Sequence, residues 1–347
     1  MRLPSVCQRA SGRGLAAFVV LLLLLAGSAA YLYSDYSRFA EAPLQPLAAP
    51  ATIDVPLGSA LPGILRELER QNVQPGSGLY WRLLARQMGV AGKLHAGEYA
   101  LTPGISPRAL LAKMAAGDVI QHHFTIVEGW TFAQLRDALA HDAGLRQTLA
   151  GVDDGALMRE LGSSDTTPEG WFLPETYSYV KGMSDLDLLR RAYEAMHKAL
   201  QKQWDAREAG LALPAPYQAL ILASIVEKET ARAEERPQIA AVFLHRLALG
   251  MKLQTDPTVI YGLGASFDGN LRKHDLETDT PFNTYTRGGL PPTPIALPGA
   301  AALAAVTHPA STNALYFVAR GDGTHEFSAT LEAHNSAVAK YQLHHGQ

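Results

Sequence analysis

A run of 20 residues without a charged side chain, residues 14–33, constrains this chain more than any other feature. As a helix the run would be about 30 Å long, which is the thickness of the hydrocarbon core of a bilayer. Arg2, Arg9 and Arg13 precede it with no acidic residue among them. Because basic residues flank membrane helices on the cytoplasmic side, we expect residues 1–13 in the cytoplasm, a transmembrane helix over residues 14–33, and the remaining chain outside the cytoplasm.

A cleaved signal peptide is the alternative interpretation of the N-terminus. Ser28-Ala29-Ala30 would serve as its cleavage site, but the apolar run is longer than a usual signal core, which favours the retained anchor. The one cysteine, Cys7, precedes the run, so the part beyond it has no thiol and no cysteine-based metal site. The formal charge is −3 and no long basic run occurs, which argues against nucleic acid as a partner.

The next part of the chain is expected to contain a linker and a small folded unit. Residues 34–50 are rich in Ala and Pro and are expected to be the linker. Residues 51–120 have the order strand, helix, helix, strand, which resembles a LysM module, a small unit that often binds glycan. A small α/β support unit without a ligand is the alternative. The expected elements are strands over 52–55 and 97–101 and helices over 61–70 and 77–88, with Ser59 and Ser77 as caps.

Residues 121–347 have the pattern of a larger mixed domain, so the fold class expected for the chain is α+β. The stretch between Met251 and Pro298 is rich in Gly, Pro, Asn, Thr and aromatic residues, and a loop of this length in a compact domain is usually functional. Helices are expected over residues 131–140, 186–204, 217–231, 238–249, 299–307 and 331–342, and strands over residues 314–319 and 325–328.

The expected helix 217–231 carries two acidic residues, Glu227 and Glu229, after a run that is apolar on every side. Since successive helical residues are about 100° apart, Glu229 continues the buried stripe that includes Leu222, whereas Glu227 lies on nearly the opposite side. A carboxyl group on an apolar face has a raised pKa and stays protonated near neutral pH, which suits a general acid. The alternative is a structural glutamate that faces solvent or pairs with Arg232.

Several longer motifs follow one another in an order that covers nearly the whole chain. They are residues 169–177 (EGWFLPETY), 227–230 (EKET), 253–262 (LQTDPTVIYG), 283–285 (NTY), 289–292 (GLPP), 308–309 (HP), 325–328 (HEFS) and 334–335 (HN). With these motifs the chain resembles the endolytic murein transglycosylases, the MltG or YceG-like family. One departure is Phe282, where the family more often has Tyr, and residues 143–164 match no motif.

The resemblance implies an enzyme that cuts the β-1,4 bond between N-acetylmuramic acid and N-acetylglucosamine in peptidoglycan strands. No water enters: the C6 hydroxyl of the muramic acid closes onto its own anomeric carbon and leaves a 1,6-anhydro end. Substrate-assisted glycosidases manage with one carboxyl group where ordinary ones need two, and one acid is enough here. Glu229 is the expected acid and base, because Glu followed by Thr resembles the Glu-Ser pair of other lytic transglycosylases; Glu227 is the less favoured candidate.

The resemblance also implies the remaining parts of the site and its surroundings. Gln254, Asp256, Asn283 and Tyr285 are expected to hold the sugar and to orient Glu229. No metal or cofactor is expected. The expected partners are peptidoglycan strands and membrane peptidoglycan synthases. The expected location is the bacterial inner membrane, with the catalytic domain outside the cytoplasm.

Other functions stand as alternatives. Ser178 and Lys181 fit the Ser-x-x-Lys element of penicillin-binding acyl enzymes, and residues 311–313 fit their Ser-x-Asn element, but the sequence has no Lys-Thr-Gly. Zinc hydrolysis is disfavoured, because the paired histidines are adjacent and no His-Glu-x-x-His occurs. The main alternative is a non-catalytic, membrane-anchored scaffold that binds glycan within the wall-synthesis machinery.

Overall fold

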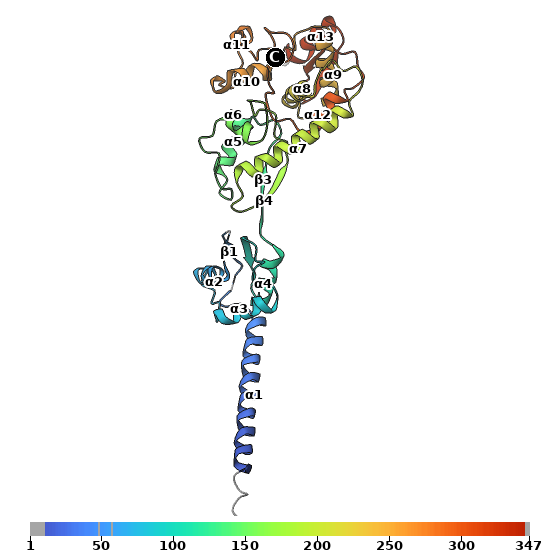
Figure 1. Cartoon of the computed structure of the whole chain (residues 1–347). Coiled ribbons are helices and arrows are strands. Elements are labelled where there is room, and N and C mark those ends of the chain that lie inside the picture. The colour runs from blue at the N-terminus through green and yellow to red at the C-terminus, as the bar shows by residue number, and fades with distance from the viewer. Residues whose placement is uncertain (1–10, 48, 57, 344–347) are drawn as a thin grey trace, which may run out of the picture. The chain divides into compact units, whose positions relative to one another are not determined.

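Figure 1 shows a computed structural model that describes residues 11–47, 49–56 and 58–343. The chain divides into two compact units, Met1–Gln121 and His122–Gln347. Cys7 and the basic residues Arg2 and Arg9, on which the predicted orientation depends, lie outside the described residues.

Helix α1 (Ser11–Glu41) contains the apolar run. It is the one helix among the described residues that is long and apolar enough to cross a membrane, and its apolar part has a mean hydropathy of 2.5. The leucines at positions 21–25 are 48–67% exposed, so no described part of the protein covers them. A helix that is apolar all round and uncovered by protein is a candidate membrane span or a signal sequence.

The helix does not end where the apolar run ends. It continues to Glu41, so this part of the expected linker is helical. Its last turns pack against the folded part of the first unit: Ala40 is fully buried, and the ring of Phe39 contacts the rings of Tyr80 and Trp81, with centroids 5.4 and 5.8 Å away. Apolar contacts with the folded part of the unit therefore stabilise the helix beyond the end of the apolar run.

The folded part of the first unit has the predicted order of strand, helix, helix and strand. In its antiparallel sheet Ile53 lies opposite Tyr99, and both side chains are fully buried. Ser59 is not a helix cap: the residue before α2 is Ala60, with no side-chain hydrogen bond. The elements are β1 (Ala51–Val55), α2 (Leu61–Arg70), α3 (Gly78–Gln87), β2 (Gly97–Leu101) and α4 (Pro107–Ala116).

The second unit is mostly helical with two small sheets, so the chain as a whole is α+β as predicted. Strands β3 and β4 pair with each other, and β5 pairs antiparallel with β6. Its elements are β3 (Gln121–Thr125), α5 (Phe132–His141), α6 (Asp154–Glu160), β4 (Thr176–Val180), α7 (Asp185–Asp205), α8 (Pro216–Glu229), α9 (Arg236–Ala248), α10 (Asp256–Leu263), a 3₁₀ turn (Gly264–Ser266), α11 (Lys273–Glu277), α12 (Ala300–Thr307), β5 (Tyr316–Ala319), β6 (His325–Ser328), α13 (Leu331–Val338) and a π turn (Ala339–Leu343).

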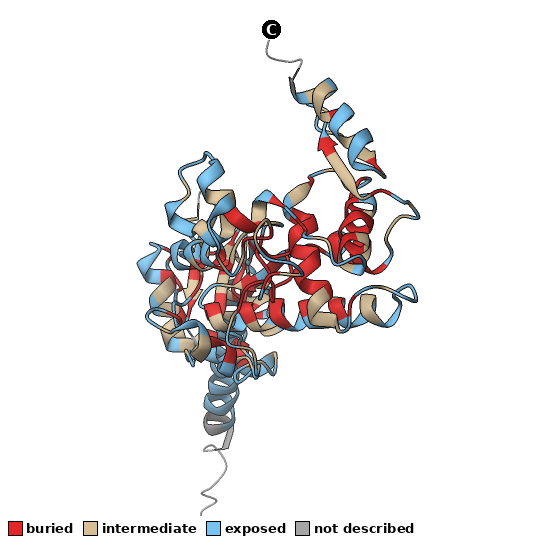
Figure 2. Ribbon diagram, turned by 90° about the horizontal axis from the view of Figure 1, so that it is seen from above, coloured by how far each residue is buried: buried red, intermediate tan, exposed pale blue. Residues whose placement is uncertain are grey.

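Helix α8 is the centre of this unit. Its residues 219–227 are all buried, and helices α7, α9, α10 and α12 pack against it. Figure 2 shows such buried residues gathered in the middle of the unit, in contrast to the exposed residues of α1. The helix ends at Glu229, two residues earlier than predicted, because Thr230 adopts an extended conformation with φ −146° and ψ 135°. Its last residue therefore lies where the core meets the surface.

The stretch between Met251 and Pro298 was expected to be a loop, and it contains two short helices. Helix α10 has a proline in its first turn and an acidic residue, Asp256, at its first position, both of which favour a helix N-terminus. Much of the rest of the stretch is irregular, and Gln254, Thr255, Asp256 and Tyr285 from this stretch line one cavity together with Glu229 at the end of α8.

Candidate active site

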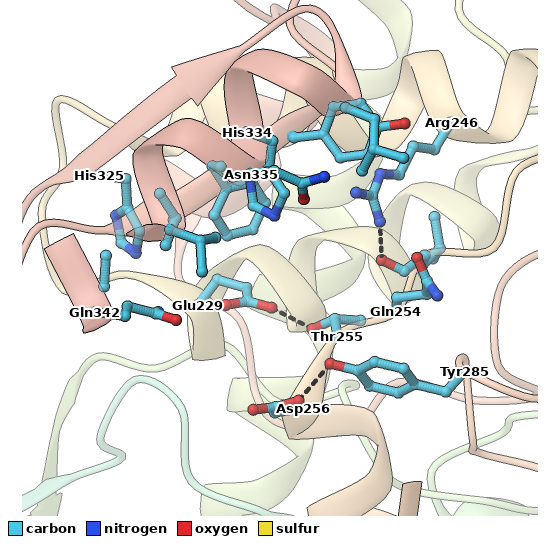
Figure 3. Close-up of a pocket in the computed structure, with 17 residues that line it drawn as sticks. Glu229, Arg246, Gln254, Thr255, Asp256, Tyr285, His325, His334, Asn335 and Gln342 are labelled. Atoms are coloured by element: carbon cyan, nitrogen blue, oxygen red, sulfur yellow. Dashed lines mark hydrogen bonds between the residues drawn. The ribbon is translucent and has the colours of Figure 1, made fainter. Parts of the chain in front are cut away.

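Glu229 lies half-buried at the C-terminal end of α8, in the wall of a cavity of about 510 Å³. Figure 3 shows its carboxyl group among side chains from α10, the 285 loop, the β5–β6 hairpin and α13. The cavity is lined by Glu229, Arg246, Leu253, Gln254, Thr255, Asp256, Tyr285, Tyr316, Phe317, Val318, Ala319, His325, Leu331, His334, Asn335, Val338 and Gln342.

The surroundings of Glu229 favour its protonated form. Burial raises the pKa of this carboxyl group, and the nearby charge of Asp256 raises it further, while the hydroxyl of Thr255 lowers it by donating a hydrogen bond to Oε1. Thr255 is itself buried, and its backbone N–H donates to the hydroxyl of Thr284 at 3.1 Å. Glu229 is thus held in one orientation, and burial shifts its pKa in the direction that suits a general acid.

Asp256 and Tyr285 form the neighbouring part of the cavity wall. The phenol of Tyr285 donates to Oδ1 of Asp256 at 2.5 Å, as Figure 3 shows. Burial raises the pKa of Tyr285 and the adjacent carboxylate raises it further, so the phenol stays protonated. Asp256 is exposed to the cavity and keeps its second oxygen for a ligand or for water.

Gln254 is exposed in the cavity wall and has an unusual backbone. Its φ is +49°, in the left-handed region that non-glycine residues seldom adopt. A hydrogen bond of 3.1 Å from its N–H to the carbonyl of Thr284 holds this conformation. Such strain concentrates at functional sites, and Gln254 lines the cavity that contains Glu229.

Asn283 occupies a different position from the other predicted ligands. It is 0% exposed and does not line the cavity. Its Nδ2 donates to the carbonyls of Leu276 and Thr278 at 3.0 and 2.7 Å, and its Oδ1 accepts from the N–H of Tyr285 at 2.8 Å. The structure therefore shows Asn283 bracing the loop that carries Tyr285.

Glu227 points away from the Glu229 cavity, as the helical phase predicts. Its Oε1 accepts from Nη2 of Arg236 at 2.8 Å and its Oε2 from the backbone N–H of Gly299 at 2.9 Å. Burial raises the pKa of Glu227, whereas the Gly299 and Arg236 contacts lower it. Both glutamates also border a smaller hollow of about 370 Å³ at the end of the helix, where Glu227 is engaged by these partners.

Several residues that line the cavity were assigned no role from the sequence. Arg246 is one: a charged residue among the apolar residues of α9 is a signal that could have identified it. His325 and His334 come from the C-terminal segment. Nδ1 of His325 lies 2.7 Å from Glu235, whose pKa is lowered by His325 despite burial that acts to raise it, and His334 stacks on Tyr316 with ring centroids 5.2 Å apart.

The alternative chemistries find little support in the geometry. No group of three His, Cys, Asp or Glu residues within the described ranges could hold a metal ion. Ser178 lies in the exposed face of β4, where its hydroxyl contacts Nδ1 of His123 at 3.2 Å, rather than at the start of a helix.

The cavity brings Glu229, whose pKa is raised by burial, together with amide, hydroxyl and ring side chains, and this arrangement suits acid–base chemistry on a polar substrate. A model of the YceG-like family matches residues 53–340, and the chain belongs to this family. An endolytic murein transglycosylase from Bacillus subtilis (strain 168) is 32% identical over 83% of this chain and 84% of that protein. These matches confirm the predicted family and enzyme class.

Two further comparisons agree. An endolytic murein transglycosylase from Streptococcus pneumoniae serotype 2 (strain D39 / NCTC 7466) is 27% identical over 84% of this chain, which spans only 58% of that longer protein. The 2.6 Å crystal structure of a putative yceG-like protein from Listeria monocytogenes superimposes with a TM-score of 0.52 and 30% identity. The superposition covers 83% of this chain and 98% of the Listeria chain.

Proposed function

We propose that this protein is a membrane-anchored endolytic murein transglycosylase. It cleaves the β-1,4 bond between N-acetylmuramic acid and N-acetylglucosamine in nascent glycan strands, leaves 1,6-anhydro ends, and so limits strand elongation. Family membership supports the class of enzyme. The observation that supports the chemistry is Glu229, half-buried and with a pKa raised by burial, in the wall of a cavity of about 510 Å³.

Glu229 acts twice in the proposed reaction. Its carboxyl proton passes to the glycosidic oxygen as the bond from that oxygen to the anomeric carbon breaks. The resulting carboxylate then takes the proton of the C6 hydroxyl while O6 bonds to the same anomeric carbon. The proton count closes without water, and Glu229 returns to its starting state. The hydroxyl of Thr255 fixes the carboxyl group in both steps.

Asp256 and Tyr285 support the charged intermediate stage. The anomeric carbon becomes positive as the bond breaks, and the carboxylate of Asp256 stabilises that charge. Tyr285 fixes the carboxylate by its 2.5 Å hydrogen bond. Gln254 offers its amide to sugar hydroxyl and acetamido groups. Asn283, predicted to bind sugar, is assigned the positioning of the Tyr285 loop.

The proposed cellular setting follows the sequence expectations. Residues 14–33 cross the bacterial inner membrane with residues 1–13 in the cytoplasm. Residues 51–120 form a LysM-like unit, and residues 121–347 form the catalytic domain outside the cytoplasm. Association with membrane peptidoglycan synthases would place the enzyme at newly made strands. The exposed apolar surface of α1 supports the anchor.

The test uses the full chain in detergent and its Glu229→Gln variant. Each is incubated with uncrosslinked glycan strands, and the products are weighed by mass spectrometry. Anhydro ends, lighter by one water than hydrolysis products, should form with the parent protein and not with the variant. Reducing ends instead would identify a muramidase. Binding of strands without cleavage by either protein would favour the non-catalytic scaffold.

A further inference from the structure

Arg246 is a buried cation that forms no ion pair with any carboxylate among the residues that the structure describes. It is 8% exposed and lines the cavity that holds Glu229. Within the described part of the chain its hydrogen bonds go only to backbone carbonyls, and it takes part in no ion pair. A charged side chain this buried is normally paired, because taking a charge out of water is costly. The missing partner is therefore to be sought in the ligand.

One end of the guanidinium is left available. Nε donates to the carbonyl of Leu315 and Nη1 to that of Leu253, each at 2.7 Å, with a longer contact of 3.4 Å from Nη1 to Lys252. The ring of Tyr316 covers one face, 5.2 Å from the guanidinium carbon. Nη2 makes no hydrogen bond to any residue that the structure describes. Its two N–H groups can thus bind an oxygen in the cavity.

Arg246 and Glu229 lie on either side of one short segment. Arg246 holds the carbonyl of Leu253, and two residues later the hydroxyl of Thr255 holds the carboxyl group of Glu229. Figure 3 shows both side chains against this segment, with Arg246 on the side of Gln254. A sugar whose glycosidic oxygen meets Glu229 therefore lies in the same cavity as Arg246.

We propose that Arg246 binds the 3-O-lactyl group of muramic acid through Nη2, and so selects muramic acid over N-acetylglucosamine for the sugar that is cleaved. This inference rests on the proposed function. The lactyl group is the one substituent that distinguishes the two sugars. In strands stripped of peptides it ends in a carboxylate, and in strands with peptide stems it ends in an amide carbonyl. A guanidinium binds either oxygen, and the carboxylate more strongly.

The experiment measures binding by calorimetry with the full chain in detergent, carrying Glu229→Gln so that no substrate is consumed. The ligands are stripped glycan strands and chitooligosaccharides of the same length, which differ by the lactyl groups. Stripped strands should bind at least about tenfold more tightly, as expected for a charge-assisted hydrogen bond. This difference should shrink with added salt. Strands with stems should also bind more tightly than chitooligosaccharides, with little dependence on salt.

Matched variants assign the effect to Arg246. Arg246→Met should remove the preference for stripped strands. Arg236→Met is the control: it removes another buried arginine of α9, one that already has a carboxylate partner, and it should leave the preference intact. Arg246→Lys keeps the charge without the planar fork and should keep part of the preference; it also serves if Arg246→Met does not fold.

The outcomes separate the two proposals. Equal affinity of the parent protein for both ligands would overturn the role of Arg246. A preference that remains in Arg246→Met would overturn it as well. If Arg246→Met does not fold, a preference that is undiminished in Arg246→Lys would overturn it. A preference that depends on Arg246 in a protein that releases no anhydro ends would retain this inference while the proposed catalysis fails.

Discussion

The last turn of α8 presents two glutamates to two different surroundings. Glu227 faces inward to Arg236 and the backbone of Gly299, which engage both of its oxygens. Glu229 faces the cavity, and the one protein hydrogen bond the structure gives its carboxyl group comes from the Thr255 hydroxyl. Burial raises the pKa of both carboxyl groups. Burial alone therefore does not distinguish the reactive acid; an oxygen left free toward a cavity does.

The strongest test of this contrast removes the proton of Glu229. Glu229→Gln keeps the shape of the side chain and its contact with Thr255 but has no acid to donate. We expect turnover of glycan strands to fall by about 10²–10⁴-fold, with little change in the melting temperature. The rate of anhydro-end formation per folded molecule is the measurement. Retention of full turnover would move the acid to another residue.

The same change at Glu227 should affect stability instead of chemistry. Glu227→Ala leaves Arg236 buried with only a longer contact of 3.4 Å to Glu128, so we expect a loss of about 3–5 kcal/mol in the free energy of unfolding. Urea denaturation checks this value. Turnover per folded molecule should stay within a few-fold of the parent. A stable but inactive Glu227→Ala protein would reverse the two assignments.

Glu169 is another carboxyl group with a raised pKa, and it lies outside the cavity, so it tests whether a raised pKa alone indicates a catalytic role. Glu169 is 4% exposed, accepts from the phenol of Tyr261 at 3.0 Å, and does not line the cavity. Burial raises its pKa from 4.5 to about 7. Because the folded state then holds a proton that the unfolded state releases, the contribution to stability is complete below pH 4.5 and is lost as the pH rises through about 7.

This loss amounts to about 3 kcal/mol and is measured as the free energy of unfolding at several pH values. Glu169→Gln should flatten the profile between pH 4.5 and 7. An unchanged slope in the variant would show that another group carries the proton.

On the cavity side, Tyr285→Phe should have a smaller effect. It removes the hydrogen bond that fixes Asp256, so we expect about a tenfold loss in turnover with a smaller change in strand affinity. Single-turnover kinetics of the parent protein and of Tyr285→Phe measure turnover. Binding of strands to the Glu229→Gln protein, with and without Tyr285→Phe, measures affinity. A fall in affinity alone would make Tyr285 a binding residue.

The smallest effect is expected at Gln254. Gln254→Gly removes the strain of a positive φ and should raise the free energy of unfolding by up to about 1 kcal/mol. It also removes an amide from the cavity, so strand affinity should fall. Gain in stability with loss of binding would confirm that the strained backbone serves the site; a loss of both would show that the side chain supports the fold.

Part of this site follows from the sequence. The phase of an apolar helix separates Glu227 from Glu229, and the adjacent Thr255 and Asp256 come with one linear motif. The role of Asn283 does not follow, because it depends on carbonyl groups that only the folded loop brings around its amide. The place of Arg246 in the cavity wall does not follow from the sequence either, because it depends on the packing of segments that are distant in the chain.

The fold was predictable to a similar depth. Helices α7 and α9 were predicted to within two residues of their ends. Helix α10 was missed, although Pro257 supplies a usual start signal, because the surrounding Gly and Pro residues indicated a loop. The extension of α1 was missed because it depends on the packing of Phe39 and Ala40 rather than on local composition.

The continuity of α1 has a mechanical consequence. A chain that leaves a bilayer through a flexible tether can turn in any direction, whereas a helix bends little over a few turns. If the apolar run lies in the membrane, the contacts of Phe39 and Ala40 attach the folded part of the first unit to the end of the same continuous helix. The unit then inherits the tilt and the rotation of the anchor. In the proposed setting, the first unit would be held at a fixed height above the membrane, with one face turned in a constant direction.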